Sequence, residues 1–258
     1  MSVWIQNLRL VLEDNPVVLL HGNVRDRYID ETGRVYENLT DLLTDVAHNL
    51  PGLSVTDLTF YDPAGGERST QLRDQPTLPA AAGDLGGTSP VTERSSPESA
   101  GSPRPREVPQ TVLARWARQL SDPRNSRFSV LFYLDKIVSY RASYNEEESQ
   151  CILWLEKAVE NISPNHRLVM VALQDTMVPV EIYTQSPKCR VIAIPMPDKA
   201  ARQRYIRQQL GEHEHLDAMA DLTDGLYLHE LHHVAEGVHS RTNVGSRELG
   251  TLINRYRV

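Results

Sequence analysis

The chain has 258 residues, 40% of them hydrophobic and 24% charged, which is enough to bury a sizeable core in one or two domains. Its formal net charge of −7 excludes a broadly basic nucleic-acid surface, so we do not expect nucleic acid as a partner. The sequence shows neither an apolar run of membrane-spanning length nor a signal-peptide pattern, and Cys151 and Cys189 fit no metal or redox spacing. We therefore expect a cytoplasmic protein with no membrane partner.

The N-terminal part of the chain alternates helical and strand patterns. Apolar residues at helical spacing predict a helix over 2–13. Four consecutive apolar residues over 17–20 predict a buried strand that runs into a tight turn at Gly22. A second helix is predicted over 39–50 and a second strand over 55–61.

The composition changes over 63–109. This stretch contains eight of the 16 prolines of the chain together with many glycines and serines, and its few apolar residues are isolated. Such a sequence cannot bury enough apolar surface to offset the conformational entropy lost on ordering. We therefore expect a long disordered insertion, which interrupts one domain because the strand pattern resumes after it.

The sequence after the insertion continues the alternation. Strands are predicted over 128–135, 168–173 and 189–194, with helices between them over 112–120 and 146–162. With the first two strands they predict an α/β core over 1–200, built on a parallel five-stranded sheet flanked by helices. A C-terminal helical lid is expected over 201–258, from helices predicted over 200–210, 216–222, 226–238 and 246–256.

The turn at Gly22 takes the place of a phosphate loop in a nucleotide-binding α/β protein. A working loop has the pattern G-x-x-x-x-G-K-[ST], in which backbone amides and a lysine hold phosphates and a hydroxyl holds magnesium. Counted from this glycine, the second glycine is Arg27, the lysine is Tyr28 and the hydroxyl residue is Ile29. Arg25 and Arg27 are the remaining candidates for phosphate contact, since arginine binds phosphate well. The alternative is that both are surface or interface arginines. ATP and magnesium are therefore candidate cofactors, but the loop lysine and the Ser/Thr hydroxyl that usually bind them are absent from this loop.

The order of the elements resembles the AAA+ ATPase module over nearly the whole chain, apart from the insertion. The stretch 128–136 looks like the Walker B strand of that family, with Asp135 at the position of the magnesium ligand and Lys136 in place of the catalytic glutamate. The strand that ends near Gln174 and Asp175 looks like the sensor-1 strand, whose polar residue orients the attacking water.

The resemblance extends to the C-terminal part of the chain. Arg190 lies where the family places arginines near a subunit interface. The segments 197–206 and 220–225 look like the beginning and the signature of the family's lid.

The departures from the family pattern concentrate where catalysis would occur. Phosphoryl transfer depends on positioning and charge neutralisation by the loop lysine, the metal and the water-orienting residue. Here Tyr28 stands in place of the loop lysine and Lys136 in place of the catalytic glutamate, so two parts of that arrangement are missing. The resemblance therefore implies a degenerate module that does not hydrolyse ATP, similar to the inactive first module of a tandem AAA+ ATPase. Its expected role is ring assembly, or docking of partners and substrates, in a ring-type oligomer with an active AAA+ module or other protein subunits.

Two other interpretations remain open. One is an ATPase with an atypical phosphate loop and a site built on Gly22, Arg25, Asp135 and Gln174, so enzymatic turnover is left undecided. The other is an inactive clamp-loader-like subunit, although the acidic charge of the chain argues against direct contact with DNA.

A zinc peptidase is a remote further alternative. The run His229-Glu230-x-x-His233 matches H-E-x-x-H, which places two imidazoles one helical turn apart with a glutamate as base, and His239 lies at the spacing of a third ligand. However, Glu236 stands where the longer pattern requires a glycine, and 19 residues follow His239. Because the apolar residues of this helix share the opposite face, we expect His229 and His233 to face solvent, and we assign no metal.

Overall fold

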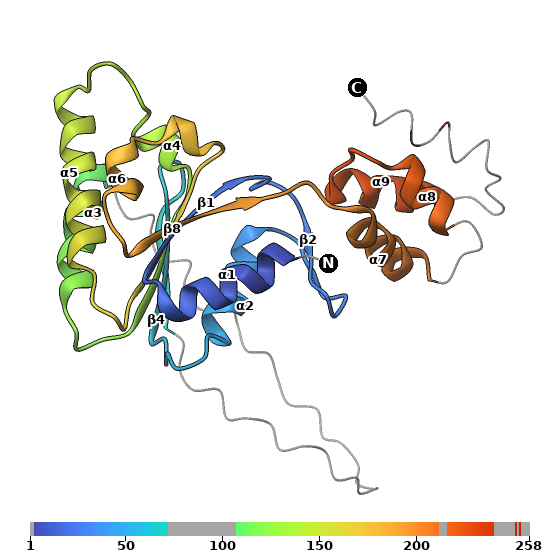
Figure 1. The fold of residues 1–258 in the computed structure, drawn as a ribbon, viewed down its shortest axis with the longest axis horizontal. Coiled ribbons are helices and arrows are strands. Elements are labelled where there is room, and N and C mark those ends of the chain that lie inside the picture. The colour runs from blue at the N-terminus through green and yellow to red at the C-terminus, as the bar shows by residue number, and fades with distance from the viewer. Residues whose placement is uncertain (1–2, 72–106, 212–215, 240–250, 252, 254–258) are drawn as a thin grey trace, which may run out of the picture.

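The structure, a computed structural model, describes residues 3–71, 107–211, 216–239, 251 and 253. Most of the predicted insertion and most of the helix predicted over 246–256 lie outside these residues. The described residues form an α/β core and a C-terminal helical lid, as the sequence predicts. Figure 1 shows the lid as a lobe beside the core.

A six-stranded sheet forms the centre of the core. Its order is β5-β4-β6-β7-β1-β8, and the five strands predicted from the sequence pair in parallel. These five are β1 (Val17–Gly22), β4 (Asp57–Asp62), β6 (Arg127–Leu131), β7 (Arg167–Val171) and β8 (Cys189–Ile194). Because β1 lies between β7 and β8, its carboxyl end meets the loops that follow those strands, which is where open α/β sheets place their ligands.

The sheet has one strand more than predicted. β5 (Gly66–Gln71) pairs antiparallel with β4, with Asp57 opposite Gln71 and Asp62 opposite Gly66. It lies within 63–109, so the expectation of disorder is wrong for the first residues of that stretch. β5 is an edge strand whose side chains are mostly exposed, and it therefore lacks the apolar pattern by which a buried strand is predicted.

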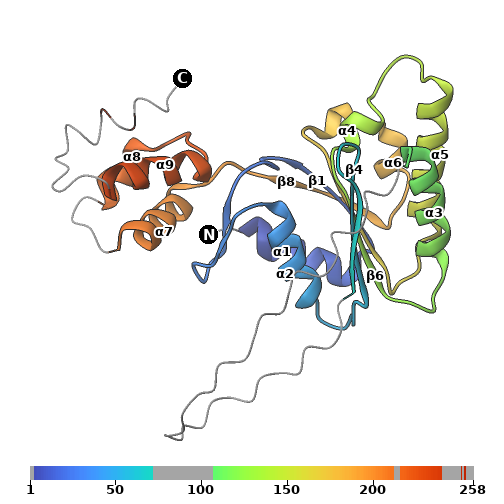
Figure 2. The same ribbon diagram turned by 180° about the vertical axis from the view of Figure 1, so that it is seen from behind.

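Helices cover both faces of the sheet. One face carries α1 (Val3–Asp14) and α2 (Leu39–His48), and the other carries α3 (Pro109–Ser121), α5 (Glu146–Asn161) and α6 (Val180–Thr184) (Figures 1 and 2). Alternate residues of β1 follow this division, since Val18 and Leu20 pack with α1 and α2, whereas Val17 and Leu19 pack with α3 and α5. The short helix α4 (Leu134–Ile137) and a 3-10 helix (Asp175–Met177) follow β6 and β7.

Polar side chains begin several of these helices. The Asn38 side chain accepts a hydrogen bond from the backbone N–H of Asp41 at the start of α2. Asn145 and Glu148 form a capping box at the start of α5. Such caps satisfy backbone N–H groups that have no partner within the helix.

Three helices form the described part of the lid: α7 (Lys199–Leu210), α8 (Leu216–Leu222) and α9 (Leu228–His239). Asp198 caps α7 by accepting a hydrogen bond of 2.7 Å from the backbone N–H of Ala201. Tyr205, Met219 and Leu231 lie at the centre of its apolar cluster, each at most 1% exposed. The lid thus has a small core of its own.

A short β-hairpin between β1 and α2 is absent from the sequence-based prediction. It consists of β2 (Tyr28–Ile29) and β3 (Val35–Tyr36), which pair antiparallel. Figure 1 shows it between the core and the lid. Two pairs of β-prone residues, Tyr28-Ile29 and Val35-Tyr36, lie on either side of the turn residues Thr32 and Gly33, which is a hairpin pattern. Each pair is too short to be predicted as a strand from a run of apolar residues.

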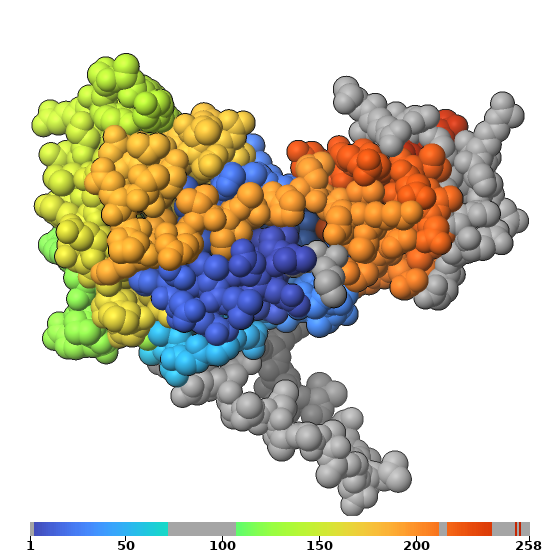
Figure 3. All heavy atoms as spheres, viewed as in Figure 1, coloured from blue at the N-terminus to red at the C-terminus, as the bar shows by residue number. Residues whose placement is uncertain are grey.

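On the face drawn in Figure 3, α1 lies along β8, the outermost parallel strand of the sheet. Among the described helices, none is long and apolar enough to cross a membrane.

Candidate functional site

The chain leaves the sheet at Gly22. The φ angle of this residue is 97°, and a Cβ atom here would lie 2.7 Å from the carbonyl oxygen of Ile194. The backbone N–H of Gly22 donates to the carbonyl of Leu173, and that of Asn23 donates to the carbonyl of Ile194, both at 3.0 Å. Glycine is therefore required by close packing against β8 as well as by its left-handed backbone.

The chain after Gly22 differs from a phosphate loop. In such a loop the strand turns directly into a helix, whose first N–H groups hold the phosphates. Here the chain forms the β2–β3 hairpin first, and α2 begins at Leu39. Tyr28 and Ile29 are buried in the hairpin at 3% and 2% exposure, so counting from Gly22 does not reach the start of a helix.

A cleft of about 360 Å³ lies beside the start of α2 at the carboxyl edge of the sheet. Arg25, Asp26 and Glu37 are among the residues that line it, and the Asp26 side chain is buried. Asp41 lies in the first turn of α2, where its carboxylate accepts a hydrogen bond of 3.0 Å from the side chain of Asn38. The aromatic side of the cleft is formed by Phe132 and Tyr133.

The two arginines predicted as phosphate ligands make different contacts. The exposed Arg25 places its guanidinium 5.3 Å from the ring centre of Tyr133, a residue whose φ of 54° is in the left-handed region. Arg27 donates to the hydroxyl of Tyr205 in the lid at 3.2 Å and forms a 2.7 Å ion pair with Glu37. A phosphate-binding role for either residue remains a prediction.

Asp135 and Gln174 lie near each other, as the parallel sheet predicts. Asp135 follows β6 in α4, and its buried Oδ1 accepts a hydrogen bond of 3.3 Å from the backbone N–H of Leu173. Its Oδ2 lies 3.6 Å from the ammonium group of Lys136. Gln174 is exposed and begins the 3-10 helix after β7. Their catalytic roles remain predictions.

Arg190 lies exposed on the edge strand β8. Its guanidinium donates to the carbonyl of Pro187 at 3.1 Å and to that of Cys189 at 3.2 Å. The position at the outer edge of the sheet is accessible to another chain, and an interface role remains a prediction.

Asp26 is a buried residue that the sequence analysis did not identify. It is 2% exposed, and its carboxylate accepts hydrogen bonds from the backbone N–H groups of Leu228 (3.0 Å) and His229 (2.9 Å). Asn23 and the backbone N–H of Arg27 donate to it from its own loop, at 2.9 and 2.8 Å. Local sequence carries no signal for this contact, because its two sides are 202 residues apart.

The H-E-x-x-H run lies in the first two turns of α9. His229 is half-exposed, and its Nδ1 lies 3.2 Å from Asp26. Glu230 accepts a hydrogen bond of 2.8 Å from the backbone N–H of Tyr227, and His233 lies 3.4 Å from Glu236. Solvent exposure of both histidines was expected, whereas the contact of His229 with Asp26 was not. Within the described ranges, no group of three or more His, Cys, Asp or Glu side chains is arranged to hold a metal.

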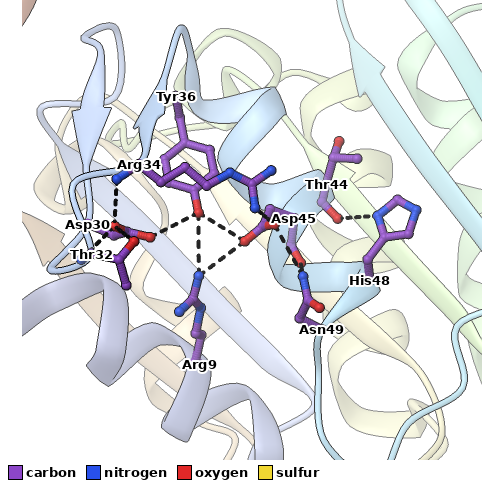
Figure 4. Close-up of polar contacts among 9 residues, drawn as sticks. All are labelled: Arg9, Asp30, Thr32, Arg34, Tyr36, Thr44, Asp45, His48 and Asn49. Atoms are coloured by element: carbon purple, nitrogen blue, oxygen red, sulfur yellow. Dashed lines mark hydrogen bonds and ion pairs between the residues drawn. The ribbon is translucent and has the colours of Figure 1, made fainter. Parts of the chain in front are cut away.

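A buried polar cluster fixes the hairpin to the core (Figure 4). The hydroxyl of Tyr36 donates to Asp45 of α2 at 2.9 Å and lies 3.3 Å from Asp30. The guanidinium of Arg9 in α1 donates to the carboxylate of Asp45 at 3.1 Å, and the guanidinium of Arg34 forms an ion pair with the same carboxylate. Asp30 closes the hairpin turn by accepting from the backbone N–H groups at 32 and 34.

The class of protein follows from this architecture. A parallel sheet with helices on both faces, followed by a small helical lid next to the loop after β1, is the arrangement of an AAA+ module. A family model described as "AAA+ chaperone, N-terminal Rossmann-like domain" matches residues 1–195. The chain belongs to this family, which confirms the resemblance seen in the sequence.

A solved structure agrees with this fold. A chain in the structure of the E. coli MS115-1 HORMA:CdnC:Trip13 complex is similar to this chain, with 12% sequence identity and a TM-score of 0.55. The match covers 97% of this chain and 77% of the other. At that identity it supports the fold alone. Among curated proteins, no match was found.

Proposed function

We propose that the chain is a degenerate AAA+ module that does not hydrolyse ATP and serves ring assembly or the docking of a protein partner. The observation that carries this proposal is the β2–β3 hairpin between β1 and α2. It separates the turn at Gly22 from the start of α2, so the backbone arrangement of a phosphate loop is lost along with its lysine.

The residues around the start of α2 do not fit a magnesium-bound triphosphate. The carboxylates of Glu37 and Asp41, next to the start of α2 and in its first turn, would repel its negative charge. Arg27 is already paired with Glu37, and Lys136 stands beside Asp135. Charge neutralisation of the transferred phosphoryl group, on which catalysis in this fold depends, therefore has little support here.

The docking role is supported by exposure at the sheet edge. Arg190 and Val191 are exposed on β8, and exposed arginine and apolar side chains are common in protein interfaces. The similar solved chain comes from a complex of several proteins, which suits a module that binds protein partners.

The test is calorimetric titration of the purified chain with magnesium-ATP, with hydrolysis followed in the same sample. We expect neither binding heat nor turnover. Binding without turnover that is lost in Arg25→Ala and kept in Arg118→Ala would show residual nucleotide binding through Arg25. Turnover that is lost in Asp135→Ala would refute the proposal and establish an ATPase with an atypical phosphate loop.

A further inference from the structure

The lid is joined to the core by more than the linker that precedes α7. Residues 23–36, which we call the loop–hairpin segment, contact both parts of the molecule. We propose that this segment is a built-in fastening that holds the lid on the core without a bound ligand, with Asp26 as its central contact. The inference goes beyond the proposed function, because it concerns the position of the lid whether or not the chain binds nucleotide.

The contact of Asp26 with α9 is an N-terminal cap supplied from a distant part of the chain. The first N–H groups of a helix have no acceptor within the helix and carry partial positive charge. The carboxylate of Asp26 accepts from two of them, at Leu228 and His229, in a site shielded from water. Tyr227, which precedes α9, has no side-chain group suited to a cap. Glu230 of α9 itself accepts the N–H of Tyr227, whereas the N–H groups of Leu228 and His229 depend on the core for their acceptor.

Two further residues of the segment reach the lid. The Arg27 guanidinium donates to the hydroxyl of Tyr205 on α7. Ile29 is 2% exposed and belongs to the apolar cluster of the lid, although it is part of the hairpin. The segment thus holds α7 and α9 at once, through a charge-assisted cap, a hydrogen bond and apolar packing.

The other side of the segment is fixed to the core. Tyr28 and Tyr36 belong to the apolar cluster formed with α1 and α2. The polar cluster of Figure 4 adds the contacts of Tyr36 and Arg34 with Asp45. The hairpin cannot follow a moving lid without breaking these buried contacts.

This arrangement has a consequence for the response to ligands. A ligand moves a lid only if it binds one lid position better than another. Here a carboxylate of the chain itself provides a permanent contact between core and lid. The lid is expected to keep one position, which presents a constant surface to a partner.

Amide hydrogen exchange of Leu228 and His229, measured by NMR on the full chain, tests the fastening directly. We expect Asp26→Ala to accelerate exchange at both amides by about tenfold to a hundredfold, as loss of a hydrogen bond to a charged group implies. Asp26→Asn keeps one acceptor oxygen and should give a smaller acceleration, and it provides the test if the alanine variant does not fold. Asp217→Ala is the matched control, because Asp217 lies on α8 of the lid and accepts a hydrogen bond from Gln203 of α7, also in the lid, instead of contacting the core.

Small-angle scattering of the same proteins reports the position of the lid. The radius of gyration should increase in Asp26→Ala, stay constant in Asp217→Ala, and stay constant when magnesium-ATP is added to the wild-type chain. Unchanged exchange at Leu228 and His229 in both Asp26 variants would overturn the fastening. A wild-type lid that moves on addition of ATP would also overturn it. Hydrolysis of ATP with both amides still protected would refute the proposed function and leave the fastening intact.

Discussion

At the scale of single residues, close approach between backbone segments decides which side chains the site can carry. Gly22 has no room for a side chain, since a Cβ atom would lie 2.7 Å from the carbonyl oxygen of Ile194, closer than a normal contact. At Asp26, four residues later, a carboxylate is required, because N–H groups from two distant parts of the chain donate to it. A buried carboxylate is stable only where such donors surround it.

Gly22→Ala should destabilise the chain by about 2–5 kcal/mol, from the left-handed backbone and the forced contact with β8. Gly33→Ala is the control, because Gly33 has a similar φ of 90° but no atom lies within 4 Å of its Cβ position. That change should cost about 1–2 kcal/mol. Urea denaturation measures both values, and equal costs would show that the contact with Ile194 is unimportant.

At the scale of elements, the β2–β3 hairpin makes the chain after β1 differ from a phosphate loop, in which the strand turns directly into a helix. It is too short to be stable alone and depends on packing against α1 and α2. Its central polar residue is Tyr36, whose pKa is raised by burial, by its hydrogen bond to Asp45 and by the charges of Asp45 and Asp30. The phenol therefore stays protonated and continues to donate to Asp45.

Tyr36→Phe should lower the free energy of unfolding by about 1.5–3 kcal/mol, because Asp45 loses a donor in a buried position. The midpoint of urea denaturation should fall with little change in its slope. Tyr140→Phe, at a side chain that is 59% exposed, should change the stability by less than about 0.5 kcal/mol. Equal midpoints for the two variants would contradict a stabilising role of the polar cluster.

At the scale of the whole molecule, the core has one apolar cluster on each face of its sheet and the lid has a third. The loop–hairpin segment contributes to the core cluster with α1 and α2 and to the cluster of the lid. The unfolding of core and lid should therefore be coupled. Of the three tryptophans of the chain, Trp116 and Trp154 lie in the core cluster with α3 and α5, whereas Trp4 also lines a pocket with Ala201 and Leu228 of the lid. In a Trp4→Phe background, the fluorescence therefore reports the core alone, and the variants below are made in this background. Circular dichroism reports the helices of both parts.

In the Trp4→Phe chain we expect the fluorescence and dichroism transitions in urea to coincide. Ile29→Ser removes an apolar side chain from the lid cluster, and part of the dichroism should then be lost at lower urea than the fluorescence changes. Ile5→Ser, at an equally buried position of α1, should shift the fluorescence transition itself to lower urea. Transitions that still coincide in Ile29→Ser would show that the hairpin does not couple the two parts.

Much of the fold could be predicted from the sequence because its signals are local. The apolar runs over 17–20 and 189–194 fall within β1 and β8, and the helix predicted over 216–222 has those bounds in the structure. β5 could not be predicted in this way, because an exposed edge strand needs no apolar pattern.

The sequence by itself determined the alternation of strands and helices, the helical lid and the resemblance to AAA+ proteins, since periodicity and motif order depend on neighbouring residues. Only the tertiary structure decided what the loop after β1 does. It showed that α2 begins at Leu39 after a hairpin, that Asp26 caps α9, and that His229 of the H-E-x-x-H run contacts this carboxylate. These contacts join segments about 200 residues apart, and the chain brings them together only when the lid packs on the core.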